Sequence, residues 1–228
     1  MSIFNPETNG LTSTGYGIAI ALIIVCCLIA SLFLNKEEKN KFSAKRLAFS
    51  AICIALAFVT SFVELIPMPL GGSVKPFTMF FVCFAGYLYG PRTGLTASLA
   101  YALLNAVTDP DLYVISIPQM LCDYVLAYGI MGISGFWNHK KFGMIKGYLA
   151  GVLGRFFFAF LSGLIFFAEY APEGWNPALY SAAYNGAYIG LEAVLTVIVL
   201  LIPPVHNALN RVKTYAYEAD AKEPMSLV

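Results

Sequence analysis

The chain has 228 residues, of which 59% are hydrophobic and only 12% are charged, and its formal net charge is +1. Soluble domains carry about 25% charged residues, so this composition, with a mean hydropathy of +0.72, excludes an ordinary soluble protein. It predicts an integral membrane protein made of α-helices. The balanced charge gives no reason to expect a nucleic-acid partner. The absence of a GxxxxGK[ST] loop means that no nucleotide-binding domain is expected in this chain.

The first predicted element is the apolar run from Gly15 to Leu34, which is twenty residues long and holds no charge. At about 1.5 Å per residue it is long enough to cross a hydrocarbon core of about 30 Å. It lacks the basic N-terminal region of a signal peptide, so we expect a retained helix. Six further apolar segments follow. The predicted spans are residues 14–34, 44–65, 75–90, 93–107, 113–136, 143–168 and 178–203.

The basic residues predict the orientation of these spans. Twelve of the fourteen Lys and Arg residues fall in clusters that can lie on one side of the membrane, and the positive-inside rule assigns that side to the cytoplasm. The opposite loops hold acids, and Lys75 is predicted to be the lone exposed base among them. We therefore expect a multi-pass protein of the cell membrane whose N-terminus lies outside, with residues 206–228 forming a cytoplasmic tail.

Three ionisable residues, Asp123, Arg155 and Glu192, fall inside predicted spans. A charge in the bilayer costs about 2.5–3.5 kcal/mol on insertion scales, so such a residue normally faces a bundle interior or an aqueous cavity. Gln119 and Asp123 are four residues apart and share one helix face. A carboxylate there would suit a cationic ligand. The alternative is a structural pair between Asp123 and Arg155.

A second group of candidate residues lies around the break before the last span. Pro172, Gly174 and Pro177 prevent a continuous helix there. The residues that follow predict an aromatic pocket near the outer leaflet, of the kind that binds small molecules. They are Phe166, Phe167, a stripe of Tyr180, Tyr184 and Tyr188, and the amide of Asn185 beside that stripe. The five cysteines show no metal-ligand spacing, so we expect neither a metal nor another cofactor.

Four separate motifs carry a family resemblance. They are residues 119–127 (QMLCDYVLA), 154–163 (GRFFFAFLSG), 170–174 (YAPEG) and 179–186 (LYSAAYNG). In their order and spacing the chain resembles the thiamine-specific S-components of energy-coupling factor (ECF) transporters, from about residue 44 to 205. The resemblance implies a six-helix substrate-binding bundle over residues 44–205. Residues 1–43, with one extra N-terminal transmembrane helix and a linker, lie outside it.

The resemblance also implies a function. Such a chain is not an enzyme but the substrate-binding membrane subunit of an ATP-driven vitamin importer, whose partners are a membrane coupling protein and two ATPase subunits. The implied substrate is thiamine, with pyridoxine or a thiamine-precursor pyrimidine as alternatives. A different reading of Asp123, Arg155 and Glu192, as a proton-relay or catalytic set, would make the chain a stand-alone carrier or a membrane enzyme.

The resemblance assigns some site residues directly. Asp123 matches a family glutamate, and Tyr124, Tyr180 and Asn185 match residues of the family's pocket. Together with Gln119, Phe167 and Tyr184 they form the predicted substrate site. Ala159 stands where the family has a histidine, and Phe167 where it has a tryptophan. The first change removes a hydrogen-bonding group, whereas the second keeps a stacking face.

A small-residue strip on the second predicted span is a candidate docking surface. Ala51 and Ala55 are four residues apart and Val59 follows, so one helix face is open to close approach by another helix. The resemblance implies that this strip contacts the coupling protein, and ordinary packing within the chain is the alternative. The glycine-containing loop at residues 71–73 is either a flap over the pocket or a simple connector.

Overall fold

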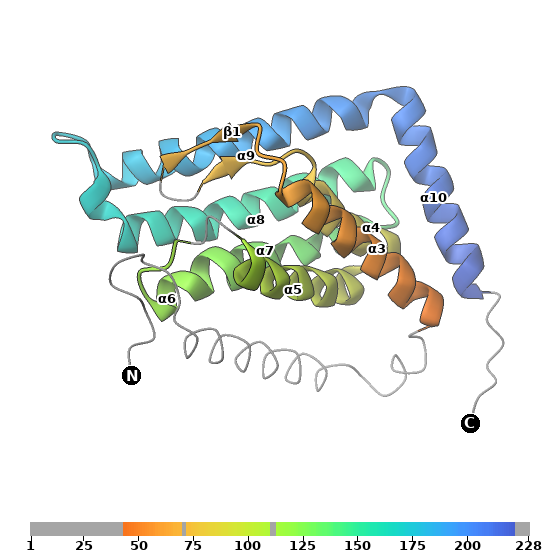
Figure 1. The fold of residues 1–228 in the computed structure, drawn as a ribbon. Helices are drawn as coiled ribbons and strands as arrows, with labels where there is room; N and C mark the ends of the chain where they lie inside the picture. The colour runs from red at the N-terminus through yellow and green to blue at the C-terminus, as the bar shows by residue number, and fades with distance from the viewer. Residues whose placement is uncertain (1–42, 70–71, 110–112, 222–228) are drawn as a thin grey trace.

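The computed structural model describes residues 43–69, 72–109 and 113–221. The predicted helix 14–34 lies outside these residues. Figure 1 shows a bundle of helices with a small hairpin beside α9 at one end and α10 crossing the other end. The elements are α3 (Ala44–Ser61), β1 (Ile66–Pro67), β2 (Ser73–Val74), α4 (Thr78–Tyr89), α5 (Pro91–Thr108), α6 (Ile117–Met120), η2 (Leu121–Leu126), α7 (Ala127–Gly129), η3 (Ile130–Trp137), α8 (Gly143–Phe166), η4 (Ala168–Tyr170), α9 (Pro177–Leu201) and α10 (Pro203–Ala221).

The predicted all-α membrane fold is confirmed. Within the described residues, four helical segments are long and apolar enough to cross a membrane, and they are Ala44–Ser61, Ile117–Trp137, Gly143–Phe166 and Pro177–Leu201. The segment Ile117–Trp137 is continuous but irregular, because it passes from an α-helical start through a π-helical turn to a 3₁₀-helical end. Two further helices belong to the bundle: α4 packs against α3, η3 and α8, and α5 packs against α3, α4 and η3.

Local sequence signals set the helix ends. The Ser43 side chain accepts a hydrogen bond from the Arg46 amide at the start of α3, and Asn176 does the same for the Ala178 amide at the start of α9. Gly90 has a φ of 93°, which favours glycine, and it separates α4 from α5, whose first residue is Pro91. A helical hairpin therefore turns sharply at Gly90.

The core is built around α4, which packs against α3, α5, α8 and η3. Every residue of this 12-residue helix except Phe81 is buried. Its length corresponds to about 18 Å, so α4 is a buried central helix, shorter than a full membrane crossing. Glycines bring the backbones of α5 and η3 together: a Cβ on Gly132 would lie 2.4 Å from the Leu95 nitrogen, and one on Gly94 would lie 2.5 Å from the Gly132 carbonyl oxygen.

The connection between α3 and α4 contains the β1–β2 hairpin. Ile66 pairs with Val74 and Pro67 with Ser73 in antiparallel register. The hairpin packs on α9 through β2, so it lies over one end of the bundle (Figure 1). Lys75, which follows β2, is only 7% exposed. The sequence-based expectation of an exposed Lys75 is therefore wrong, because this loop folds back onto the bundle.

The segment expected as a tail contains a well-defined helix. A break at Ile202 and Pro203 turns the chain, and α10 then packs on α3, α4 and α9. The Tyr87 hydroxyl donates to the Asn210 side-chain oxygen at 3.3 Å. The Lys213 ammonium lies 3.9 Å from the centroid of the Tyr87 ring, in a cation–π contact. The end of α4 is thus fixed by α10.

We predict that Gly132→Ala destabilises the protein, because the new methyl group would collide with the backbone of α5. Overpacking of this kind costs about 1–3 kcal/mol of unfolding free energy. The matched control is Gly190→Ala, because a Cβ there meets no atom within 4 Å. Thermal unfolding in detergent should show a lower Tm for Gly132→Ala alone, and equal Tm values for the two variants would contradict the close packing.

Candidate functional site

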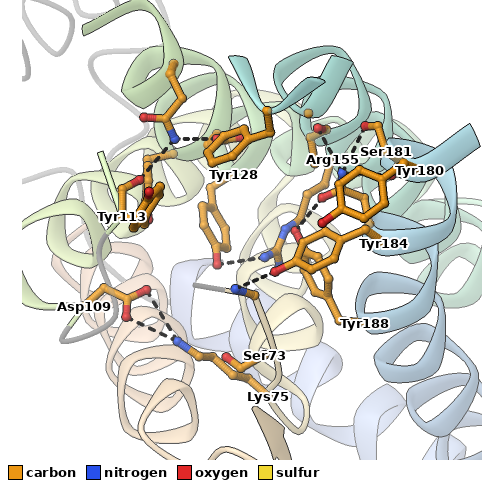
Figure 2. A pocket seen from close by; sticks show the side chains of 18 residues that line it. Ser73, Lys75, Asp109, Tyr113, Tyr128, Arg155, Tyr180, Ser181, Tyr184 and Tyr188 are labelled. Carbon is orange, nitrogen blue, oxygen red and sulfur yellow. Dashed lines mark hydrogen bonds and ion pairs between the residues drawn. The ribbon is translucent and has the colours of Figure 1, made fainter. Parts of the chain in front are cut away.

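A cavity of about 840 Å³, including the part that opens to the outside, lies between the hairpin, the start of the Ile117–Trp137 segment, α8 and α9. Figure 2 shows the side chains that converge on it from these elements. The lining residues are Gly72, Ser73, Lys75, Asp109, Tyr113, Gln119, Asp123, Tyr124, Tyr128, Arg155, Ala159, Gly163, Phe167, Tyr180, Ser181, Tyr184, Asn185 and Tyr188. Aromatic walls with a few placed polar groups are typical of small-molecule sites.

Asp123 is held in place by neutral partners. Its Oδ2 accepts hydrogen bonds from the Gln119 side-chain amide at 2.6 Å and from the Ser162 hydroxyl at 2.8 Å. Asp123 lies on the π-helical turn Leu121–Leu126, and such turns recur at functional sites. Among the described residues, Asp123 forms no ion pair with Arg155, so the alternative of a structural pair between them is not observed.

The Gln119 amide that supports Asp123 is itself fixed. Its nitrogen also donates to the Tyr113 carbonyl oxygen at 3.2 Å, and its oxygen accepts from the Ile115 amide at 3.2 Å. Both groups of this amide are therefore engaged with the protein. Gln119 acts on the site through the carboxylate it holds.

The tyrosine stripe of α9 forms another wall. The Tyr184 ring lies 6.1 Å from the Tyr180 ring and 5.8 Å from the Tyr188 ring, between centroids. The Tyr184 hydroxyl accepts from the Gly72 amide at 3.1 Å and donates to the Pro69 carbonyl oxygen. It therefore joins both sides of the hairpin turn to α9. Gly72 and Ser73 line the cavity as the flap hypothesis requires, whereas residue 71 lies outside the described ranges.

Asn185 connects α9 to α8. Its amide nitrogen donates to the Ala159 carbonyl oxygen at 3.2 Å and to the Ser181 carbonyl oxygen at 3.0 Å. Its oxygen accepts from the Tyr188 hydroxyl at 3.0 Å. The buried amide is thus satisfied within the protein, and the group it presents to the cavity is an acceptor.

An acidic and basic cluster lines the cavity near the hairpin. The Lys75 ammonium lies 3.4 Å from a carboxylate oxygen of Asp109 and 3.6 Å from one of Glu64. Burial, the largest effect, lowers the pKa of Lys75, but Tyr128, Asp109 and Glu64 outweigh it, so the pKa lies above its ordinary value. Lys75 is therefore a charged member of the cavity wall at neutral pH. Sequence reasoning missed it, although its place as the lone base among acidic loops was a signal.

The structure brings together all seven residues predicted for the substrate site: Gln119, Asp123, Tyr124, Phe167, Tyr180, Tyr184 and Asn185 line one cavity. Their role in binding stays a prediction. Ala159 also lines the cavity, and the Phe167 ring lies 6.0 Å from that of Tyr113, between centroids. Sequence reasoning missed Asp109, Tyr113 and Tyr128. Each of them also has a contact distant in the chain: Asp109 with Lys75, Tyr113 with Tyr170 and Tyr128 with Arg155.

The predicted docking strip lies elsewhere. Ala51, Ala55 and Val59 are exposed on α3, whereas Cys53 and Ala57 point into the core. No residue of α3 lines the cavity.

Comparison with known proteins identifies the family. A family model described as thiamine transporter protein matches residues 47–211, which is most of the chain. The chain belongs to this thiamine transporter family. The match covers nearly the same segment as the predicted bundle at residues 44–205.

Individual relatives are thiamine transporters as well. The thiamine transporter ThiT of Bacillus subtilis (strain 168) is 28% identical over 172 residues, which is 69% of this chain and 88% of that protein. ThiT of Lacticaseibacillus paracasei is 30% identical over 95 residues, which is 36% of this chain and 47% of that protein. A solved structure of ThiT from Listeria monocytogenes has the same fold, with a TM-score of 0.57 at 24% identity, covering 70% of this chain and 94% of that chain.

We predict that Lys75→Met lowers stability, because it removes the cation shared by the carboxylates of Asp109 and Glu64. Removing one partner of a buried ion pair costs about 3–5 kcal/mol. Lys75→Arg should restore much of the loss. Lys146→Met, at an exposed position of α8, is the control and should stay within about 0.5 kcal/mol of wild type. Thermal unfolding in detergent measures all three, and an unchanged Tm for Lys75→Met would contradict the structural role of this cluster.

Proposed function

We propose that this chain binds thiamine and is the substrate-binding membrane subunit of an ATP-driven ECF importer. The observation that carries the proposal is the Asp123 carboxylate, which lines an aromatic cavity and has only neutral hydrogen-bond donors among the described residues. Thiamine carries a fixed positive charge on its thiazolium ring. A carboxylate and tyrosine faces attract such a cation by charge and by cation–π interaction.

The family membership supports thiamine over the alternatives. Pyridoxine and the thiamine-precursor pyrimidine lack the permanent cation that would complement Asp123. The Phe167 ring keeps a stacking face at the position where the family has a tryptophan. Alanine at position 159 provides no side-chain hydrogen bond, unlike the histidine that the resemblance implies there. The ligand would therefore be bound through a different set of polar contacts.

The carrier or enzyme hypothesis finds less support. It requires Asp123, Arg155 and Glu192 to work as one set, but Glu192 accepts a hydrogen bond from the Met79 amide at 2.9 Å, in the first turn of α4. That contact is structural. Under the importer proposal, the energy for uptake comes from other chains, namely two ATPase subunits that act through a coupling protein.

We infer an orientation from the distribution of charge. Lys140 and Lys141 follow Asn138, whose carbonyl oxygen accepts a hydrogen bond from Lys213 of α10, and Arg211 lies on α10 itself. These basic residues therefore lie at the end of the bundle where α10 packs, and that end would face the cytoplasm. The hairpin and the acidic loops lie at the other end. The cavity would then open to the outside of the cell membrane, where an importer captures its substrate.

A first test is the affinity of Asp123→Asn for thiamine, measured by isothermal titration of the purified protein without ATP. Removing the charge from such a site commonly costs about 2–5 kcal/mol, so affinity should fall more than about tenfold. Glu169→Gln is the matched control, because Glu169 is exposed on η4 and does not line the cavity. Saturable binding of pyridoxine but not thiamine by the wild type would overturn the substrate assignment.

A second test separates binding from coupling. Ala51→Leu with Ala55→Leu adds bulk to the exposed strip on α3, so co-purification with the coupling module and cellular thiamine uptake should be lost. Thiamine affinity should be retained, because the strip does not line the cavity. The control is Ala183→Leu with Ala187→Leu, an equally spaced exposed pair on α9. Normal uptake by the α3 double variant would show that the strip is not the docking surface.

A further inference from the structure

Arg155 is a cation of the cavity wall that the proposed thiazolium site does not use. It lies on α8, and one guanidinium nitrogen donates to the Tyr128 hydroxyl at 2.9 Å. The guanidinium carbon lies 4.2 Å from the centroid of the Tyr128 ring and 6.0 Å from that of Tyr188. Figure 2 shows Arg155 between Tyr128 and Tyr188, at the cavity. The aromatic contacts hold the plane of the guanidinium and leave its edge available for other groups.

The protein uses few of the hydrogen-bond donors of Arg155. A guanidinium has five N–H groups, and the described residues accept from one of its nitrogens only. They also give Arg155 no ion pair, in contrast to Lys75, which has two carboxylate partners. Each side-chain nitrogen of Arg155 either has a hydrogen-bond partner or is accessible to solvent. The remaining donors are therefore free for an acceptor on a ligand.

Next to Arg155 the cavity offers an acceptor in a defined orientation. The Asn185 nitrogen faces the carbonyl oxygens of Ala159 and Ser181, which can only accept, so the amide oxygen must be the atom that faces Tyr188. Tyr188 is also the residue whose ring packs near Arg155. A donor group and an acceptor group are thus presented by neighbouring parts of the wall.

Charge decides which way a cationic ligand lies. Ser162, which holds Asp123, and Arg155 are seven residues apart on α8, which corresponds to about 10 Å along the helix. Asn185 contacts α8 between them, at Ala159. A positive ring is attracted to the Asp123 end and repelled from the Arg155 end. The uncharged part of a two-ring ligand therefore belongs beside Asn185 and Arg155.

We propose, on the basis of the proposed function, that Arg155 and Asn185 together read the aminopyrimidine edge of thiamine. The exocyclic amino group donates to the Asn185 oxygen, and the adjacent ring nitrogen accepts from Arg155. The thiazolium lies toward Asp123. Arg155 is then a specificity-determining residue, and it supplies donors to a site that has an alanine at position 159.

The experiment compares thiamine with its 4-oxo analogue, in which a carbonyl replaces the amino group and the adjacent ring nitrogen carries a hydrogen. The analogue has acceptor and donor exchanged along this edge, while its thiazolium is unchanged. Isothermal titration of the wild-type protein should give an affinity for the analogue at least about 100-fold weaker than for thiamine, because buried polar groups would be left unpaired. Equal affinities would overturn the inference and leave thiamine binding intact. Failure to bind thiamine at all would overturn the proposed function.

Variants assign the discrimination to Arg155. Arg155→Met keeps the length of the side chain but removes every donor, so the preference for thiamine over the analogue should shrink to about tenfold or less. Arg155→Lys keeps the charge without the planar fork and should give an intermediate preference. Arg211→Met, at an exposed position of α10, should keep the wild-type preference. A purely structural role would weaken both ligands equally, and an unchanged preference in Arg155→Met and Arg155→Lys would overturn the assignment.

Discussion

The structure depends on how buried polar groups are satisfied where little water is available to do so. The central case is the contact between Glu192 of α9 and the amide of Met79 in the first turn of α4, at 2.9 Å. The first amides of a helix have no partner within the helix, and they attract a negative charge. Glu192 meets that need and fixes α9 to the helix against which α3, α5 and α8 also pack. A carboxylate that would be costly alone thereby organises the bundle.

The need to satisfy buried polar groups also applies to the charged residues that line the cavity. Lys75 is engaged by Asp109 and Glu64, so this cation is balanced within the protein. Asp123 and Arg155 have neutral hydrogen-bond partners and lie on different elements, so their opposite charges remain available along one wall. Each charge that lacks an ionic partner is most stable when a ligand supplies one. A dipolar arrangement of this kind favours a ligand with its positive charge at one end and its acceptors at the other.

Long apolar helices were predictable because charges or prolines delimit them. The predicted segments 143–168 and 178–203 agree closely with α8 (Gly143–Phe166) and α9 (Pro177–Leu201). Hydrophobicity alone did not distinguish a spanning helix from α4, which is apolar because protein surrounds it. The β1–β2 hairpin was missed because its strands are only two residues long and Tyr184, more than a hundred positions later, fixes its turn. The α10 helix was missed because only one face of it packs on the bundle.

The sequence could place candidate site residues side by side where neighbours in space are also neighbours on one helix. Gln119 and Asp123, or Tyr184 and Tyr188, are spaced by four residues and so share a face. It could not do so for Lys75, whose partner Asp109 is 34 positions away. Asn185 lies between these cases. Its depth indicated a functional amide, but the sequence could not show that the carbonyl oxygens of Ala159 on α8 and Ser181 on α9 accept from its nitrogen while its oxygen faces Tyr188. In an apolar bundle a buried polar group needs partners, and the fold supplies them to both atoms of the Asn185 amide. The fold sets the orientation, and the orientation decides what the site accepts.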